Sequence, residues 1–75
     1  MRLSELSQGQ KARIKEVADS NFKEKLNEMG CIVGEEISIM FKAPFGDPVA
    51  YLVAGYCLSM RLKEASTVEV ELIHE

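Results

Sequence analysis

Side chains that could carry out catalysis or hold a metal ion are few in this sequence and widely spaced. His74 is the only histidine, and Cys31 and Cys57 are the only cysteines. A serine nucleophile needs a base placed to take its proton, and a zinc site needs several histidine or cysteine ligands close together. A lone histidine supplies neither arrangement. We therefore expect no enzymatic activity, no cofactor and no metal ligands.

Glu35 and Glu36 are the closest approach to a catalytic pair of carboxylates. Consecutive side chains on a strand point to opposite faces, so these two cannot act on one substrate. The glycines lack the spacing of a P-loop, so nucleotide binding is not indicated either. Cys31 and Cys57 stand among apolar neighbours, which favours two buried thiols in a reducing compartment over a disulfide between them.

The charge and hydropathy of the chain argue against two kinds of partner, nucleic acid and the membrane interior. The 75 residues include 12 acidic and 9 basic side chains, giving a net charge of −3. An acidic chain repels phosphate backbones, so nucleic acid is not an expected partner. No apolar run approaches the roughly 20 residues that cross a bilayer, and the first residues do not resemble a signal peptide. We expect a cytoplasmic protein with one domain, residues 1–75, and no direct insertion into a membrane.

The first regular element predicted is a strand at residues 11–18, preceded by a polar lead-in over residues 1–10. Apolar and polar residues alternate along the strand, but the alternation slips once between Ile14 and Val17. A β-bulge there would restore the inward face.

A short helix is predicted directly after this strand. Asn21 followed three residues later by Glu24 resembles a capping box, so the helix should begin at Asn21. Gly30 supplies the left-handed residue that ends many helices. Three apolar residues share one face of the helix and should dock it on a sheet: Phe22, Leu26 and Met29.

Four more strands are predicted at residues 35–42, 49–54, 57–62 and 67–73. In the first of them Ile37, Ile39 and Phe41 are expected to point inward. The two residues Gly55 and Tyr56 separate the next two strands and predict a type II′ hairpin turn. Five short strands with one short helix after the first indicate an all-β fold, a small and partly open barrel.

The loop at residues 43–48 is predicted to be stiff. Pro44 and Gly46 fit the second and fourth positions of a type I turn, and Pro48 favours an extended Asp47. Exposed apolar groups on a stiff loop lose little entropy on binding, so this loop is suited to contact with another protein.

Three segments together resemble the ferrous iron transport protein A family, FeoA: KLNEMG at 25–30, APFGDP at 43–48 and GYCLSMR at 55–61. The resemblance covers essentially the whole chain, with three departures: Cys31, Cys57, and Lys25 where the family usually has arginine. It implies an SH3-like β-barrel of about five strands with a small helical insertion. It also implies a bacterial cytoplasmic accessory protein of ferrous iron uptake, acting as a protein–protein adaptor on the cytosolic GTPase portion of the transporter FeoB.

Six residues are the predicted contacts with that partner: Pro44, Phe45, Asp47, Pro48, Tyr56 and Arg61. The alternatives are that Phe45 folds back onto the barrel, that Asp47 caps its own loop, and that Arg61 pairs with Glu36 or Glu69 across strands. Two other functions stay open. One is a transition-metal-binding or metal-sensing domain, and the other is a module that associates weakly with itself.

Overall fold

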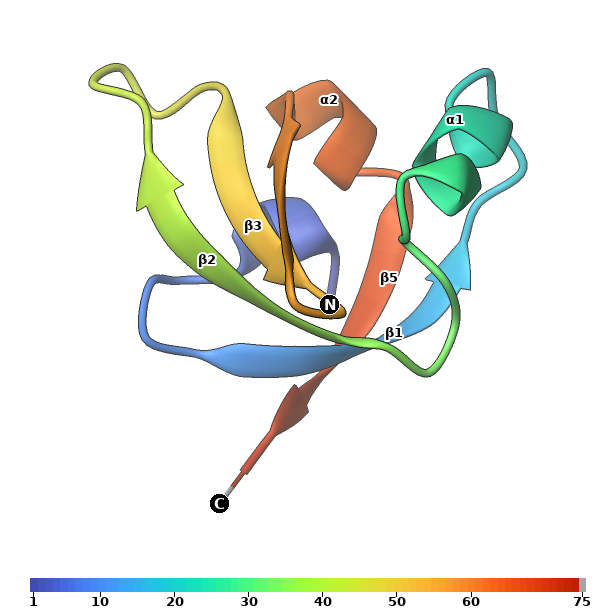
Figure 1. The fold of residues 1–75 in the computed structure, drawn as a ribbon, viewed down its shortest axis with the longest axis horizontal. Coiled ribbons are helices and arrows are strands. Elements are labelled where there is room, and N and C mark those ends of the chain that lie inside the picture. Colours follow the sequence, from blue (N-terminus) through green and yellow to red (C-terminus); the bar gives the residue numbers. More distant parts are fainter. Residues whose placement is uncertain (75) are drawn as a thin grey trace.

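The computed structural model describes residues 1–74. Its elements follow in this order: the 3₁₀ turn η1 (Leu3–Glu5), β1 (Lys11–Val17), α1 (Lys23–Glu28), β2 (Glu36–Lys42), β3 (Val49–Val53), β4 (Tyr56–Met60), α2 (Leu62–Ala65) and β5 (Val68–Ile73). The strands form one antiparallel sheet in the order β4-β3-β2-β1-β5. The sheet curls strongly and leaves α1 and α2 at one end of the barrel (Figure 1). The five predicted strands and the helix after the first are confirmed.

The N-terminal residues are part of the barrel, which the predicted polar lead-in did not anticipate. The Val70 N–H donates to the Met1 carbonyl oxygen at 2.7 Å, and Arg2 forms an antiparallel bridge with Glu69. Leu3 and Leu6 are both buried. A 3₁₀ helix has three residues per turn, so a leucine pair at this spacing faces one side and enters the core.

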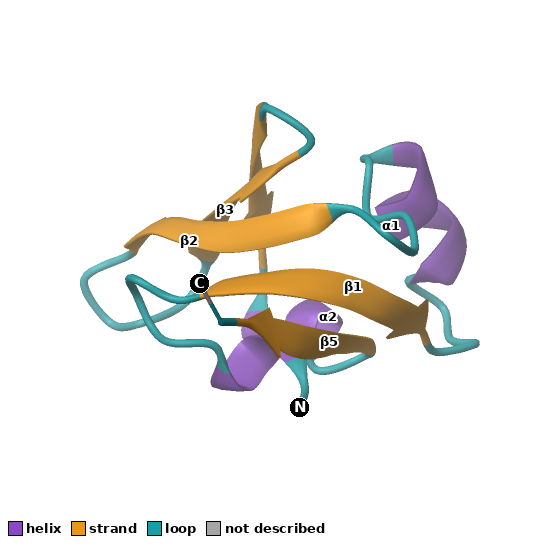
Figure 2. Ribbon diagram, turned by 90° about the horizontal axis from the view of Figure 1, so that it is seen from below, coloured by secondary structure: helices purple, strands orange, loops and turns teal. Residues whose placement is uncertain are grey.

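The strand β1 lies between β2 and β5 in the curled sheet (Figure 2). Its pairing with β5 shifts register between Ile14 and Glu16. The shift confirms the predicted bulge and brings Val17 back to the buried face, where it is 4% exposed.

The start of α1 differs from the prediction. The helix begins at Lys23 with Phe22 at its N-cap, and no side chain caps it. Instead of Asn21, Ser20 bonds the local backbone, its Oγ accepting from the Phe22 N–H at 3.2 Å. Such short side-chain bonds compete with regular capping. Gly30 has a φ of +105°, which confirms the predicted left-handed stop.

Phe41 was predicted to point inward and is 58% exposed. The β2–β3 pairing shifts register between Ile39 and Phe41, so Met40 is the extra residue of a bulge. A bulge moves every following side chain to the other face, and Phe41 therefore lies on the outside of the sheet.

The β3–β4 hairpin is confirmed, but its turn lies one residue earlier than predicted. Val53 pairs with Tyr56, and the turn residues are Ala54 and Gly55. Their φ values are +50° and +85°. Two positive φ angles define a type I′ turn, so the type II′ prediction at Gly55-Tyr56 is wrong.

The short helix α2 replaces the predicted end of the fourth strand. Glu64 Oε1 accepts from the Arg61 N–H at 2.9 Å, and Asp47 Oδ1 accepts from the Leu62 N–H at 3.0 Å. Both donors belong to the helix start, where backbone N–H groups have no partner within the helix. One of the two acceptors comes from a distant loop, which local sequence patterns cannot reveal.

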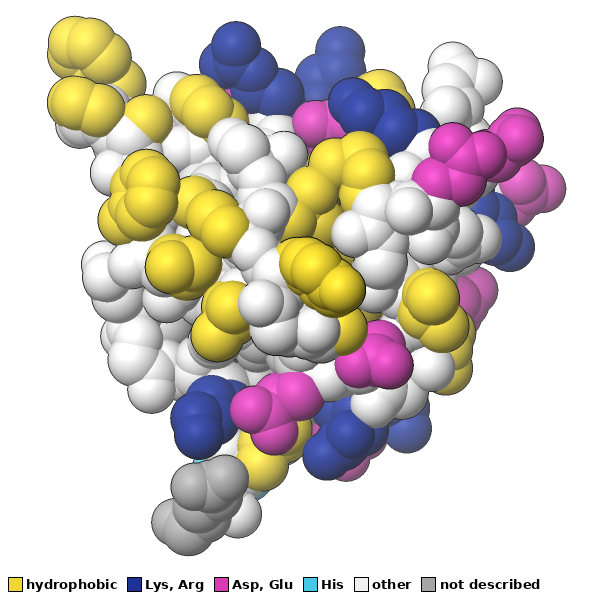
Figure 3. All heavy atoms as spheres, viewed as in Figure 1, with side chains coloured by type: hydrophobic (Ala, Val, Ile, Leu, Met, Phe, Trp, Pro, Cys, Tyr) yellow, Lys and Arg dark blue, Asp and Glu magenta, His cyan; other side chains and the backbone are white. Residues whose placement is uncertain are grey.

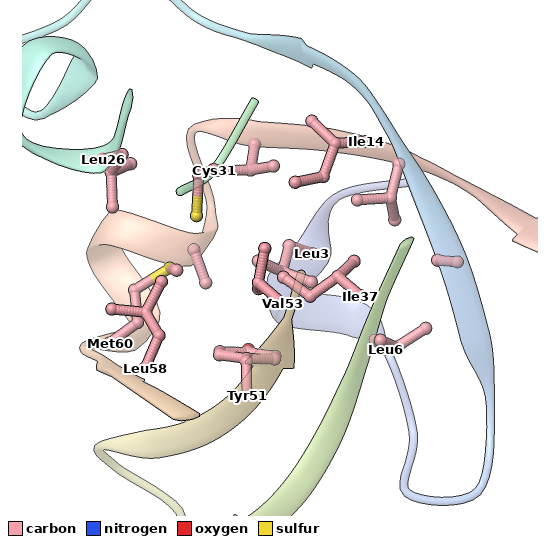
Figure 4. Packing of buried hydrophobic residues seen from close by; sticks show 14 of the residues in the cluster. Leu3, Leu6, Ile14, Leu26, Cys31, Ile37, Tyr51, Val53, Leu58 and Met60 are labelled. Carbon is pink, nitrogen blue, oxygen red and sulfur yellow. The ribbon is translucent and has the colours of Figure 1, made fainter. Parts of the chain in front are cut away.

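The core fills the space between the curled sheet and the helices. It draws side chains from every strand as well as from η1 and α1. Figure 4 shows Leu26 and Cys31 at one end of the core and Tyr51 and Val53 near its centre.

Candidate protein-binding surface

The loop at residues 43–48 has the stiffness that its sequence predicts. The Gly46 N–H donates to the Ala43 carbonyl oxygen at 2.7 Å, as in a type I turn, and the Ala43 N–H donates to the Pro48 carbonyl oxygen at 3.0 Å. Phe45 stands at the tip and is 100% exposed. It therefore does not fold back onto the barrel.

Asp47 has a structural contact beyond its own loop. Because its carboxylate accepts from the Leu62 N–H, the loop is held against the start of α2. Pro48 is half-buried beside it, while Pro44 is exposed. Asp47 thus ties the loop that carries Phe45 to the start of α2.

Tyr56 is 75% exposed, but it lies at the other end of β3 from Phe45. The five residues of β3 span about 13 Å at roughly 3.3 Å per residue. The predicted contact residues therefore lie in two separate places, with Phe45 beyond one end of β3 and Tyr56 beyond the other.

The surface between these ends was not predicted. It is the outer side of β2, β3 and β4, and we call it the uncharged face: Met40, Phe41, Leu52 and Cys57, all exposed. Yellow side chains gather over this part of the molecule in Figure 3, with Lys, Arg, Asp and Glu at its borders. A sequence signal was available, because residues 49–60 contain no charged side chain. The outer face of an exposed antiparallel sheet normally carries polar residues.

Arg61 does not have either predicted cross-strand partner opposite it. Glu36 lies on β2 and Glu69 on β5, and neither strand neighbours β4 in the sheet. The Glu69 carboxylate instead accepts from the Met1 amino group. Arg61 is exposed at the N-cap of α2, close to the base of the Phe45 loop.

A charged contact joins the two helices. The Lys25 ammonium donates to Glu64 Oε2 at 2.8 Å, and the carboxylate is 8% exposed while the lysine is 60% exposed. The Lys25 bond first, and the Arg61 N–H second, hold the pKa of the Glu64 carboxyl below its ordinary value. This contact fixes α1 relative to the segment that carries Arg61.

The two cysteines differ from one another, contrary to the expectation that both are buried. Cys31 is fully buried, and burial together with the nearby Glu64 charge raises the pKa of its thiol to about 11. Cys57 is exposed on the uncharged face, because its side chain points outward from β4. Both thiols are free.

We predict that one thiol of the native protein reacts readily with iodoacetamide at neutral pH and that the other reacts only on unfolding. Thiolate is the reactive form, and buried Cys31 is both inaccessible and protonated. Mass spectrometry after timed labelling measures the two sites separately. The Cys57→Ser variant should label only in denaturant, and rapid native labelling of that variant would contradict the assigned burial.

Within residues 1–74, no three histidine, cysteine, aspartate or glutamate side chains gather closely enough to hold a metal ion. The longest helix described there has six residues, too few to cross a membrane. What this part of the chain offers is an exposed surface with aromatic ends and an uncharged middle.

Comparison with known proteins agrees with this description. The FeoA domain family matches residues 1–72. The chain belongs to the FeoA family. It is 42% identical over 74 residues to an Fe(2+) transport protein A/Fe(2+) transporter FeoB fusion protein from Porphyromonas gingivalis. The match covers 97% of this chain and 9% of that protein.

Solved FeoA structures are among those similar to this one. Iron(II) transport protein A from Clostridium thermocellum is 40% identical with a TM-score of 0.89, over 97% of this chain and 46% of that one. A zinc complex of FeoA from Stenotrophomonas maltophilia, described as a prokaryotic SH3 domain protein, is 32% identical with a TM-score of 0.83. That match covers 95% of this chain and 89% of the S. maltophilia chain. The predicted SH3-like fold and the FeoA resemblance are therefore confirmed.

Proposed function

We propose that this FeoA chain is a one-domain cytoplasmic accessory protein of ferrous iron uptake, which binds the cytosolic GTPase portion of FeoB and catalyses no reaction. The observation that carries the proposal is the P. gingivalis relative, in which an FeoA part and an FeoB part share one polypeptide. Fusion keeps two parts together at a high effective concentration, which favours an interaction between them. Ferrous iron is the cargo of the transporter in this proposal and needs no ligand on FeoA.

The contact we propose consists of the uncharged face and its two ends. Five of the predicted residues are contacts in this proposal: Pro44, Phe45, Pro48, Tyr56 and Arg61. Asp47 positions the loop through its bond to Leu62. A fully exposed phenylalanine on a hydrogen-bonded loop is already ordered, so its burial on a partner costs little entropy.

The test is a titration of FeoA against the isolated GTPase portion of its own FeoB, in the GDP-bound, GTP-analogue-bound and nucleotide-free states. Phe45→Ala should weaken binding about 10- to 150-fold, because burial of a phenylalanine contributes about 1.5–3 kcal/mol. Its unfolding curve should not change, since Phe45 has no buried surface. Glu24→Ala is the control, because Glu24 is exposed on α1 and lies outside the uncharged face and its two ends.

Absence of binding in every nucleotide state, and to the intact transporter in detergent, would overturn the proposal. So would equal binding by the wild type and the Phe45→Ala variant, which would remove the loop from the contact.

The zinc-bound S. maltophilia relative favours a second candidate, an FeoA that senses a transition metal directly. Calorimetry with ferrous iron under anaerobic conditions tests it. Micromolar binding would support a sensor, and binding no tighter than millimolar would exclude one. Sedimentation at several protein concentrations tests the weak self-association in the same samples.

A further inference from the structure

A groove lies between the loop that follows α1 and the β3–β4 turn. It has a volume of about 330 Å³ and is open to solvent. Its lining joins segments that are distant in the sequence: Glu28, Met29, Gly30, Ile32, Glu35, Ala54 and Tyr56. The groove therefore exists only in the folded chain.

The apolar part of the groove is well supported. Met29 is partly buried and packs on the core, so it provides a fixed floor. Ile32 is 53% exposed and Tyr56 is 75% exposed, and both line the opening. A side chain entering here would meet the apolar surface of these three residues.

The polar part consists of two carboxylates, Glu28 and Glu35, from two different segments. Within residues 1–74, neither carboxylate has an ion pair or a side-chain hydrogen bond. Two basic groups near them are engaged in other bonds. Lys25, three residues before Glu28, donates to Glu64. The Arg13 guanidinium donates to the carbonyl oxygen of Gly34, the residue before Glu35, at 2.8 Å. Glu28 is also the last residue of α1, where the helix dipole disfavours a negative charge.

We infer that this groove receives an arginine side chain from the protein partner, an inference that rests on the proposed function for the identity of that partner. An arginine has an apolar stem that suits Met29 and Ile32. Its planar guanidinium can stack on the Tyr56 ring and reach more than one carboxylate. A purely apolar or an acidic occupant would leave two carboxylates desolvated without a partner, which is costly.

The first test is independent of FeoB and uses N-acetyl-arginine amide as the probe in a ¹H–¹⁵N NMR titration of the full chain. Millimolar concentrations should shift the backbone signals of residues 28–35 and 54–56. The neutral citrulline analogue should shift them at least several-fold less. Equal shifts with both compounds, or shifts outside these segments, would overturn the inference.

The second test uses the GTPase portion of FeoB and the double variant Glu28→Gln/Glu35→Gln. Loss of two charge-assisted bonds should weaken binding about tenfold or more, and the remaining affinity should depend less on salt. The Tyr56→Phe variant should bind like the wild type, because it keeps the ring face, whereas Tyr56→Ala should not. Glu24→Gln is the matched control, an exposed glutamate on α1 that does not line the groove.

The two tests separate the inference from the proposed function. A positive arginine titration with no binding to FeoB would support the groove and overturn the proposed partner. Binding to FeoB that is unaffected by the double variant would overturn the groove and leave the proposed function standing.

Discussion

Leu26→Ala is expected to remove most of the stability of this protein. Leu26 is completely buried, and it is the one residue of α1 that the fold buries fully. Truncation of a buried leucine costs about 2–5 kcal/mol, from lost transfer energy and from the cavity left behind. A chain of this size has a free energy of unfolding near the low end of about 5–15 kcal/mol, so this loss amounts to roughly half of it or more.

The loss of structure should be greatest in α1, because this helix is not stable on its own. It has six residues, far fewer than the roughly 12–15 at which an isolated helix becomes marginally stable. Its position therefore depends on Leu26, with help from the partly buried Phe22 and Met29. Loss of Leu26 should also displace Met29, which forms the floor of the groove.

Urea unfolding followed by circular dichroism measures the change. Leu26→Met is the matched control, because it keeps the volume and should cost less than about 1.5 kcal/mol. Ile32→Ala changes an exposed residue in the adjacent loop and should have little effect. If Leu26→Ala lowers the free energy of unfolding by less than about 1 kcal/mol, the prediction is wrong. The core would then be stable without the contact that Leu26 makes from α1.

The strands could be predicted because their evidence is local. Alternation of apolar and polar residues is a property of each segment, and it located the strands to within one or two residues. Phe41 was misplaced because the bulge at Met40 exists only in pairing with β3, which contributes one residue where β2 contributes two. The helix α2 was missed because one of its caps, Asp47, comes from a different loop.

The candidate surface could be predicted only at its ends. Phe45 and Tyr56 belong to turns with recognisable sequences, and both are exposed as an adaptor requires. The uncharged face between them depends on which strands neighbour one another. The groove depends on Glu28 and Glu35 meeting the β3–β4 turn, about 20 residues further along the chain. Contacts of that kind are set by the fold and have no local pattern.

Glu64→Gln is expected to destabilise the protein at neutral pH by about 1.5–3 kcal/mol, the range for a hydrogen bond to a charged group. The buried carboxylate accepts from the Lys25 ammonium and from the Arg61 N–H, and an amide replaces at most part of these bonds. Lys25 is 60% exposed, so water screens its contribution and the Arg61 bond should account for much of the loss.

The same residue should make stability depend on acid pH, and the sign follows from its pKa. The folded protein holds the pKa of the Glu64 carboxyl below the ordinary value of about 4.5. The ionised form is therefore favoured by folding, and its stabilisation is fully present above about pH 4.5. It is lost as the pH falls through the lowered pKa of the folded state.

Urea unfolding of the wild type and Glu64→Gln between pH 7 and pH 2.5 tests this dependence. The difference between their free energies of unfolding should be constant above about pH 5 and should shrink below pH 4.5 as the wild-type carboxylate is protonated. Glu16→Gln is the control for loss of a carboxylate, because Glu16 is exposed on β1 and belongs to neither helix. A Glu64→Gln difference that stays constant down to pH 2.5 would show that the glutamate stabilises the fold by its shape and not by its charge. The link between α1 and α2 would then not depend on the ion pair with Lys25.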